Sequence, residues 1–317
     1  MKGEVERAQI DRFADALAAL PPGRLALAVS GGPDSLALLL LARAARPGAV
    51  IAATVDHGLR RAAADEAAMV ARVCARLGVP HAILATTVPD DPAGLQAAAR
   101  TARYAELGRW AVAGRATALA TAHHLDDQAE TVLMRLARGA GIAGLSGIRR
   151  QRPLEGVTGV TLVRPLLDWS KAELEALVAA AGLTPARDPS NHDPRFDRTR
   201  ARALLEGGWP SAERVAAVAS RLAEAEAALA WTAARLAAER IAGDGDAVRI
   251  DARDLPREHR RRLLLAGIAR LAPDRVPRGD SLDRLLAALD AGTIATLAGV
   301  RCDPGPPWRL TRARAHG

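Results

Sequence analysis

The sequence predicts an α/β fold, in which a parallel, Rossmann-like sheet domain is followed by a smaller, mainly helical C-terminal domain. Three observations predict it. The length of 317 residues suits about two domains. Over roughly the first two thirds, short apolar runs alternate with helix-like stretches, as in parallel sheets that helices cover on both faces. Beyond that region the alternation is lost, so we place the domains at 1–205 and 206–317.

Each expected strand is a short apolar run, and each expected helix is the Ala- and Leu-rich stretch that follows it. The expected strands are 25–30, 49–56, 81–88, 116–124 and 162–167. The expected helices are 35–46, 62–78, 95–114, 126–138 and 171–182. Ligands on such sheets bind at the carboxyl ends of the strands, so the polar residues after each strand are the first candidates for a site.

The second domain is expected to begin with one long helix at 211–239, where apolar residues recur three and four apart. A strand at 247–252, a helix with a basic cluster and a basic tail rich in Pro and Gly follow. The basic cluster is Arg260, Arg261 and Arg262. Near the end of the first domain, the segment 185–203 is predicted to be a structured loop or linker.

The composition excludes several classes of protein. No apolar run approaches the ~18 residues of a membrane span, and the N-terminus lacks an apolar signal segment, so we expect a cytoplasmic protein without a membrane partner. The two cysteines, Cys74 and Cys302, stand in no metal or redox spacing. The formal charge of +8 favours a polyanionic partner such as nucleic acid. This charge is almost all Arg, which GC-rich coding also produces, so charge alone leaves that partner open.

The strongest motif is SGGPDS, which joins the first expected strand to the first expected helix. Its residues are Ser30, Gly31, Gly32, Pro33, Asp34 and Ser35. The glycines let the backbone turn sharply, and their N–H groups with those of the helix N-terminus form an anion-binding nest. Asp34 suits a metal ligand or a helix cap. No GK[ST] of a Walker A loop follows, and an ordinary strand–helix turn is the alternative.

Two further motifs place polar residues beside this loop. Asp56 and His57 end the second strand, where they suit contacts with adenosine. The alternative is an ordinary turn without a ligand role. Arg100 and Arg103 are three apart on the third helix and share a face. Such a pair suits the binding of phosphate groups. The alternative is that both arginines lie on a solvent-exposed face of the helix.

The segment TAHHLDDQAET (121–131) gathers polar residues at the end of the fourth strand. Its adjacent pairs are His123 with His124 and Asp126 with Asp127. Adjacent side chains point in different directions and no distant third ligand is evident, which disfavours a transition-metal site. Mg²⁺ that binds together with ATP phosphates needs only one or two carboxylates, and it is favoured.

The motifs together carry a family resemblance. SGGPDS resembles the PP-motif of the ATP pyrophosphatase superfamily, whose enzymes split ATP between its α and β phosphates. The further motifs follow in the order VDHGLR (55–60), LQAAARTARY (95–104), AHHLDDQAET (122–131), RGAGIAGLSGI (138–148), RPLL (164–167) and DPSN (188–191). In combination they resemble the tRNA(Ile)-lysidine synthetase family over residues 22–205.

The resemblance implies a PP-loop ATPase domain and a ligase. In this family, ATP adenylates the C2 oxygen of the wobble cytidine in the CAU anticodon of an isoleucine tRNA. The ε-amine of free lysine then attacks C2 and expels AMP, which leaves lysidine. The likeness implies that residues 30–35 bind ATP, that Asp34 and Asp127 serve Mg²⁺ or the lysine amine, and that Arg103 serves the adenylate or a phosphate.

The same likeness assigns Arg198 and Arg200 to the site or to tRNA contacts. We expect 206–317 to dock the tRNA, with Arg260, Arg261 and Arg262 on its phosphates. The oligomeric state stays open, a homodimer included.

Other functions compete with this one. A tRNA 2-thiocytidine synthetase is disfavoured because sulfur transfer needs paired cysteines or an iron–sulfur cluster. Synthetases of the GMP or NAD type need no basic appendage. A non-catalytic RNA-binding relative is disfavoured because the phosphate loop and Asp127 are intact.

Overall fold

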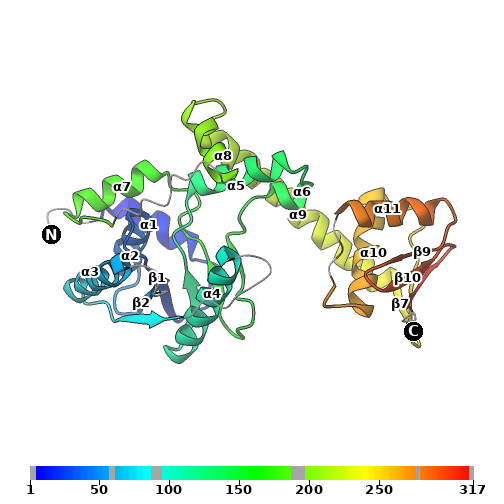
Figure 1. The fold of residues 1–317 in the computed structure, drawn as a ribbon, viewed down its shortest axis with the longest axis horizontal. Coiled ribbons are helices and arrows are strands. Elements are labelled where there is room, and N and C mark those ends of the chain that lie inside the picture. The colour runs from blue at the N-terminus through cyan, green and yellow to red at the C-terminus, as the bar shows by residue number, and fades with distance from the viewer. Residues whose placement is uncertain are drawn as a thin grey trace. The chain divides into compact units, whose positions relative to one another are not determined.

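The computed structural model describes residues 5–56, 61–86, 95–186, 197–275, 277 and 279–313. The chain forms two compact units, Met1–Ala223 and Glu224–Gly317, and the division falls within the long helix α9 (Ala212–Arg240) (Figure 1). The boundary predicted after residue 205 precedes this helix and stays a prediction. The structure confirms the long helix itself, within one residue at each end of the expected 211–239.

Unit 1 is built on a six-stranded sheet in the order β3-β2-β1-β4-β6-β5. Its strands are β1 (Arg24–Ala28), β2 (Val50–Asp56), β3 (His81–Ala85), β4 (Ala116–Ala120), β5 (Gln151–Pro153) and β6 (Thr161–Val163). All pairs are parallel except β5 with β6, which confirms the predicted α/β class. The chain leaves β1 toward β3 and returns to the other side of β1 at β4. The carboxyl ends of β1 and β4 therefore lie together at a topological switch point.

Helices cover both faces of this sheet. The helices that precede α9 are α1 (Arg7–Ala16), α2 (Pro33–Ala45), α3 (Arg61–Leu77), α4 (Leu95–Ala113), α5 (Leu125–Ala137), α6 (Ile142–Leu145), α7 (Lys171–Ala180) and α8 (Asp197–Glu206). Side chains of α1, α2, α3 and α7 share one core with residues of β1 and β2, whereas α4 packs on the opposite face (Figure 1). Helix α2 is buried without interruption from Ser35 to Ala42, which explains why its sequence is apolar on every side.

Two expectations about unit 1 need correction. The strand expected at 116–124 ends at Ala120, because His124 caps helix α5 and its N–H donates to Asp127 Oδ2 at 3.1 Å. The segment expected as a loop or linker at 185–203 contains the start of α8, at Asp197. Helices α5, α8 and α9 meet in a small apolar cluster around Ala129, Val132 and Val215.

Unit 2 combines helices with a five-stranded antiparallel sheet in the order β7-β8-β11-β10-β9. Its remaining elements are β7 (Ile241–Asp244), β8 (Ala247–Ile250), α10 (Arg257–Leu271), α11 (Gly279–Asp290), β9 (Ala295–Leu297), β10 (Val300–Asp303) and β11 (Trp308–Arg312). The two helices pack on one face of the sheet through residues such as Leu264, Leu286 and Leu310. Only the strand at 247–252 was expected from the sequence, and the structure shortens it to Ala247–Ile250. All strands of this sheet are three to five residues long, which leaves little local pattern to predict them from.

In the part of the chain that the structure describes, no helix has both the length and the apolar character needed to cross a bilayer.

The burial of Trp169 in the core of unit 1 predicts its contribution to stability. Trp169 is 1% exposed, and its ring stacks under the Arg12 guanidinium at 4.1 Å. Trp169→Ala should lower the free energy of unfolding by about 3–5 kcal/mol, because it leaves a large cavity. Trp231 on α9 is 64% exposed, so Trp231→Ala should cost below about 1 kcal/mol. Urea titrations followed by far-UV circular dichroism measure both free energies of unfolding. Equal losses in the two variants would contradict the assignment of Trp169 to the core.

Candidate active site

The loop 30–35 joins β1 to α2 and is fixed by one buried hydroxyl. Ser35 Oγ accepts hydrogen bonds from the N–H groups of Ser30 at 3.2 Å and Gly31 at 3.1 Å, and it donates to the Gly32 carbonyl at 2.9 Å. Two N–H groups of the predicted anion nest are therefore already bonded. The N–H groups of Gly32, Asp34 and Ser35 remain for a ligand, because the first N–H groups of a helix have no intrahelical acceptor.

The two glycines of this loop have different roles. Gly31 has φ +91°, and a Cβ atom there would lie 3.1 Å from Met69 Cε and 3.3 Å from Val70 Cγ2. Gly32 has φ −71°, and its nearest neighbour to an added Cβ would be Ser30 Oγ at 3.9 Å. The fold therefore requires glycine at position 31, whereas position 32 has open space above it.

A buried imidazole connects the loop to the start of α5. His124 Nε2 lies 3.6 Å from Asp34 Oδ2 and 3.6 Å from Asp127 Oδ2, and Nδ1 lies 3.4 Å from Asp126 Oδ2. Burial opposes the charged form of His124, but Asp126, Asp127 and Asp34 outweigh it and raise the pKa of this imidazole. The structure thus brings together the predicted residues Asp34 and Asp127 through a histidine to which the sequence gave no role.

The three carboxylates around His124 differ in their partners. Burial raises the pKa of Asp34 despite nearby His124, and Asp34 Oδ1 is buried without a hydrogen-bond partner. Asp126 Oδ2 accepts from the N–H of Lys171 at 2.8 Å, which ties α5 to α7. The hydrogen bond with His124 lowers the pKa of Asp126. Asp126 therefore has a structural role, and Asp34 and Asp127 face the site.

A second charged group lies one helical turn further along α5. Glu130 is 3% exposed; its Oε2 accepts from Arg198 Nε at 2.5 Å and its Oε1 from Arg202 Nε at 2.9 Å. Arg198 Nη2 also donates to Asp127 Oδ1. These carboxylates raise the pKa of Arg198 against the effect of burial. The structure thus places the predicted Arg198 at Asp127, whereas the predicted Arg200 lies exposed on α8.

Of the other predicted residues of unit 1, Asp56 and Arg103 are described by the structure and His57 is not. Asp56 ends β2, and its carbonyl accepts from the N–H of Thr86 at 3.0 Å. His57 and the DPSN segment (188–191) lie outside the described residues. Arg103 lies on α4 with its guanidinium carbon 5.6 Å from the centre of the Tyr104 ring, and burial lowers its pKa.

His123 is a further polar group at this edge that the sequence singled out without a role. Its Nδ1 lies 3.0 Å from Thr121 Oγ1. Burial lowers the pKa of His123 to about 4, so the ring is neutral at pH 7.

Comparisons with known proteins show the family of this chain. Residues 5–206 match the PP-loop domain family. The chain is 47% identical to a tRNA(Ile)-lysidine synthase of Novosphingobium aromaticivorans, over 99% of this chain and 97% of the relative. It is 44% identical to that of Zymomonas mobilis, over 92% of this chain and 89% of the relative. The chain belongs to the tRNA(Ile)-lysidine synthase family.

A solved structure supports the fold of the family's catalytic domain. The U34-tRNA thiolase NcsA from Methanococcus maripaludis, solved with its [4Fe-4S] cluster, is similar with a TM-score of 0.57 at 20% identity. The match covers 69% of this chain and 78% of the thiolase. At this identity the likeness shows a shared fold and no shared activity.

The predicted basic cluster of unit 2 is held by carboxylates within that unit. Arg260 pairs with Asp290, Arg261 Nε with Glu258 at 2.9 Å, and Arg262 with Glu226 at 2.6 Å. The exposed fractions of the three arginine side chains are 25%, 26% and 14%. These arginines therefore stabilise the packing of unit 2, and their contact with tRNA stays a prediction.

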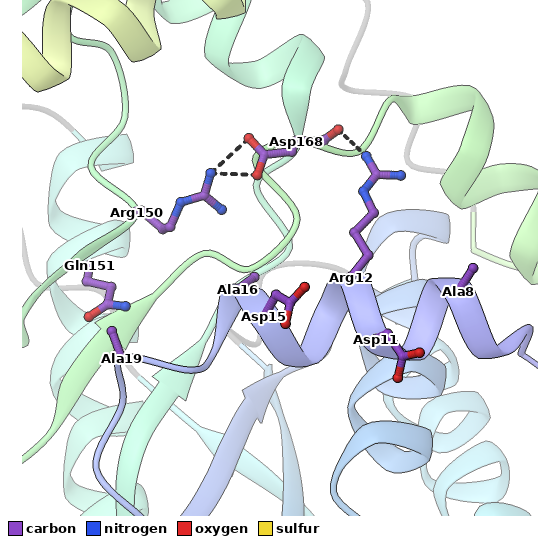
Figure 2. Close-up of a pocket in the computed structure, with 9 residues that line it drawn as sticks. All are labelled: Ala8, Asp11, Arg12, Asp15, Ala16, Ala19, Arg150, Gln151 and Asp168. Carbon is purple, nitrogen blue, oxygen red and sulfur yellow. Dashed lines mark hydrogen bonds and ion pairs between the residues drawn. The ribbon is translucent and has the colours of Figure 1, made fainter.

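One cavity, of about 620 Å³, lies away from these site residues of the synthase (Figure 2). It is open and lies between α1 and the segments that carry Arg150 and Asp168. Arg150 Nη2 donates to both Asp168 carboxylate oxygens, at 2.8 and 2.6 Å, and Arg12 donates to the Asp168 carbonyl (Figure 2). These bonds hold α1 to the segment after β6, so we interpret the cavity's polar lining as structural.

The contrast between the two glycines predicts separable effects. Gly32→Ala should cost at most about 1 kcal/mol of stability, the scale of an N-cap change, yet weaken ATP binding by about ten-fold or more. The methyl group would occupy the open space over the loop, where the phosphates are expected. Equilibrium binding of ATP and a thermal melt measure the two effects.

Gly31→Ala is the matched control for this prediction. It should lower thermal stability even without ATP, because alanine is strained at φ +91° and its Cβ contacts Met69 and Val70. Unchanged ATP affinity in Gly32→Ala would contradict the phosphate-loop assignment.

Proposed function

We propose that this enzyme forms lysidine on the wobble cytidine of the CAU-anticodon isoleucine tRNA. The kinship with tRNA(Ile)-lysidine synthases over 99% of the chain carries this proposal. In the first step the cytidine O2 attacks the α-phosphorus of ATP and pyrophosphate leaves. In the second step the lysine ε-nitrogen attacks C2, the C2–O bond breaks, and AMP leaves with that oxygen. One proton of the attacking amine goes to a base.

The phosphate loop and the ends of β1 and β2 are assigned to ATP. The free N–H groups at Gly32, Asp34 and Ser35 suit the pyrophosphate that leaves, because they combine hydrogen bonds with the positive end of the α2 dipole. Asp56 and His57 are assigned to the adenosine half. Arg103 is assigned to the adenylate, whose negative charge a half-buried guanidinium binds strongly.

The residues at the switch point fit a magnesium ion that binds together with ATP. Among the described residues, no three His, Cys, Asp or Glu side chains gather as a complete metal site. Mg²⁺ on phosphates needs only one or two carboxylates, and the unpartnered Asp34 Oδ1 supplies an oxygen of the right kind. Both Asp127 oxygens accept hydrogen bonds, so we assign Asp34 to Mg²⁺ as its main protein ligand. The ion would neutralise phosphate charge.

The carboxylates of α5 are assigned to the lysine amine. Asp127 and Glu130 together bind one cation in the structure, the Arg198 guanidinium. An ε-ammonium carries the same charge and suits the same oxygens, so lysine binds here if Arg198 moves aside. A free ε-amine has a pKa near 10.4 and is protonated at pH 7. Asp127 therefore has two tasks, to position the ammonium and to accept its proton.

A sulfur-transferring function is less consistent with the structure. Thiolation needs reactive cysteines, and both cysteines of this chain are buried in different units. Burial raises the pKa of Cys74 to about 11 and that of Cys302 to about 12, so neither thiol ionises at pH 7. Buried thiols without thiolate character are poor sulfur carriers.

The reaction itself is tested with purified protein, ATP, Mg²⁺, isotope-labelled lysine and unmodified isoleucine tRNA with a CAU anticodon. We expect the label in a modified cytidine of the digested tRNA, with one AMP and one pyrophosphate formed for each lysine incorporated. Methionine tRNA is the control, because its anticodon is the same and its other bases differ. Release of ADP and phosphate, or label without ATP, would contradict the proposal.

The role of Asp127 gives a second prediction. Asp127→Asn should lower the rate of lysine transfer by about 100-fold or more, because the amide neither accepts a proton nor pairs with an ammonium. Asp126→Asn is the matched control, since Asp126 bonds the Lys171 backbone and contacts the other site residues only through His124. Its effect should appear in thermal stability and be small in rate. If both variants keep rates within a few-fold of the wild type, Asp127 has no catalytic role.

A third prediction concerns tRNA docking by unit 2. Arg309 is exposed on β11, where its guanidinium is accessible to a phosphate of the tRNA. Arg309→Gln should weaken tRNA binding and reduce its salt dependence, with ATP affinity unchanged. Arg262→Gln, which breaks partly buried ion pairs, should instead destabilise unit 2. An unchanged salt slope in Arg309→Gln would remove this face from the interface.

A further inference from the structure

A group of arginines at the edge of the site has no role in the reaction proposed above. Arg100 lies on α4, one turn before Tyr104, with its guanidinium carbon 5.0 Å from the centre of the tyrosine ring. Arg164, the first residue of the RPLL motif, follows β6 and also faces Tyr104. The sequence gave no role to Arg164.

Arg164 is an unusual arginine because it is only 4% exposed. Its Nη1 donates to the Arg149 carbonyl at 2.6 Å, but its Nε is buried without an acceptor. The hydroxyl of Tyr104 is also buried; Arg164 and Arg103 lie beside it, but neither makes a hydrogen bond of good geometry to it. Buried donors without acceptors cost free energy, so a ligand that supplies oxygen atoms here would be stabilised.

The charge of this group is not balanced within the described residues. Glu130 and Asp127 pair with arginines of α8, but no described carboxylate pairs with Arg100 or Arg164. Burial lowers the pKa of Arg164, neighbouring Tyr104 opposes this in part, and Arg152 and Arg100 lower the pKa further. A buried guanidinium that lies among like charges and without a counter-ion favours binding of an anion.

The position of the group separates it from the pyrophosphate. Arg164 follows Leu162 by two residues on an extended segment, so both are on the sheet face that α4 covers. The phosphate loop begins α2, which packs on the opposite face. The charges of Arg164 and Arg100 lower the pKa of His123, and the charge of Asp127 raises it. Both arginines therefore lie near His123, which follows β4, and near Asp127. The adenosine is assigned to β2, on the other side of β1, so the β4–β6 side is where the target nucleotide must enter.

We propose that Arg164 and Arg100 bind a phosphodiester of the tRNA next to the wobble cytidine, with the Tyr104 hydroxyl as a further donor. This inference rests on the proposed function, because it needs an RNA in the site. The buried, half-bonded Arg164 forms the floor of the anion site and the exposed Arg100 its outer edge. A guanidinium fork binds two phosphate oxygens at once, so this contact fixes the register of the loop while the base is held for adenylation.

The test is a double-substitution cycle between protein and RNA. The probe is the anticodon stem–loop with a CAU loop, in its natural form and with a neutral methylphosphonate at each linkage that flanks the wobble cytidine. With the wild type, one neutral linkage should weaken binding by about ten-fold, the scale of one charge-assisted contact. Arg164→Gln should weaken binding of the natural RNA by a similar factor. The neutral linkage should then cause no further loss in that variant, because the two changes remove the same contact.

Two further variants complete the design. Arg100→Gln changes an exposed residue, so it gives the same cycle even if Arg164→Gln fails to fold in circular dichroism. Arg109→Gln is the matched control, because it removes the same charge from the same helix at an arginine that pairs with Glu106. In Arg109→Gln the neutral linkage should keep its full effect. ATP affinity should be unchanged in all three.

Each other outcome overturns the inference. Additive losses in the cycles would show that these arginines and that phosphate do not meet. A loss of ATP affinity in place of RNA affinity would show that the anion is a phosphate of the nucleotide. If the wild type forms lysidine normally and the cycles are additive, only this inference fails. If the wild type neither binds the stem–loop nor forms lysidine, the proposed function fails with it.

Discussion

The candidate active site depends on one buried imidazole among three carboxylates. His124 lies within 3.6 Å of Asp34, Asp126 and Asp127, which come from the starts of two helices that follow neighbouring strands. Three carboxylates would repel one another and resist burial, and the imidazole between them, whose pKa these carboxylates raise, lessens both effects. This contact therefore fixes α2 to α5 across the switch point, and the phosphate loop to the carboxylates of α5.

A second set of ion pairs brings the last helix of the catalytic unit to the same place. Glu130 is buried and binds Arg198 and Arg202 of α8, and Arg198 reaches Asp127 as well. Removing one member of such a group leaves a buried charge without a partner, which is costly. The same physics makes the group suitable for chemistry, because a cationic substrate that displaces Arg198 finds two carboxylates already in position.

Positive charge has two different uses in this chain. Arg260, Arg261 and Arg262 pair with carboxylates of unit 2 and contribute to its packing, although as a run of sequence they look like a nucleic-acid patch. Arg164 stands alone in the sequence, yet it is buried beside Tyr104 with an unsatisfied donor. Binding of an anion therefore depends on which guanidiniums have carboxylate partners, and a count of arginines does not reveal this.

The sequence by itself determined the α/β class, the strand–helix order of unit 1, the long helix and the phosphate loop, because these depend on local periodicity and on glycines at a turn. Polar residues after parallel strands meet at one edge, which indicated the place of the site, and the family resemblance selected Asp34 and Asp127 among them. Only the tertiary structure decided that His124 joins them, that Asp126 also bonds the backbone at the start of α7, and that Gly31 is required by packing while Gly32 is not. It also decided the sheet of unit 2 and the partners of the arginines. Short strands and ion pairs between residues 68 or 71 positions apart leave no local pattern, because their stability comes from contacts that exist only after the chain has folded.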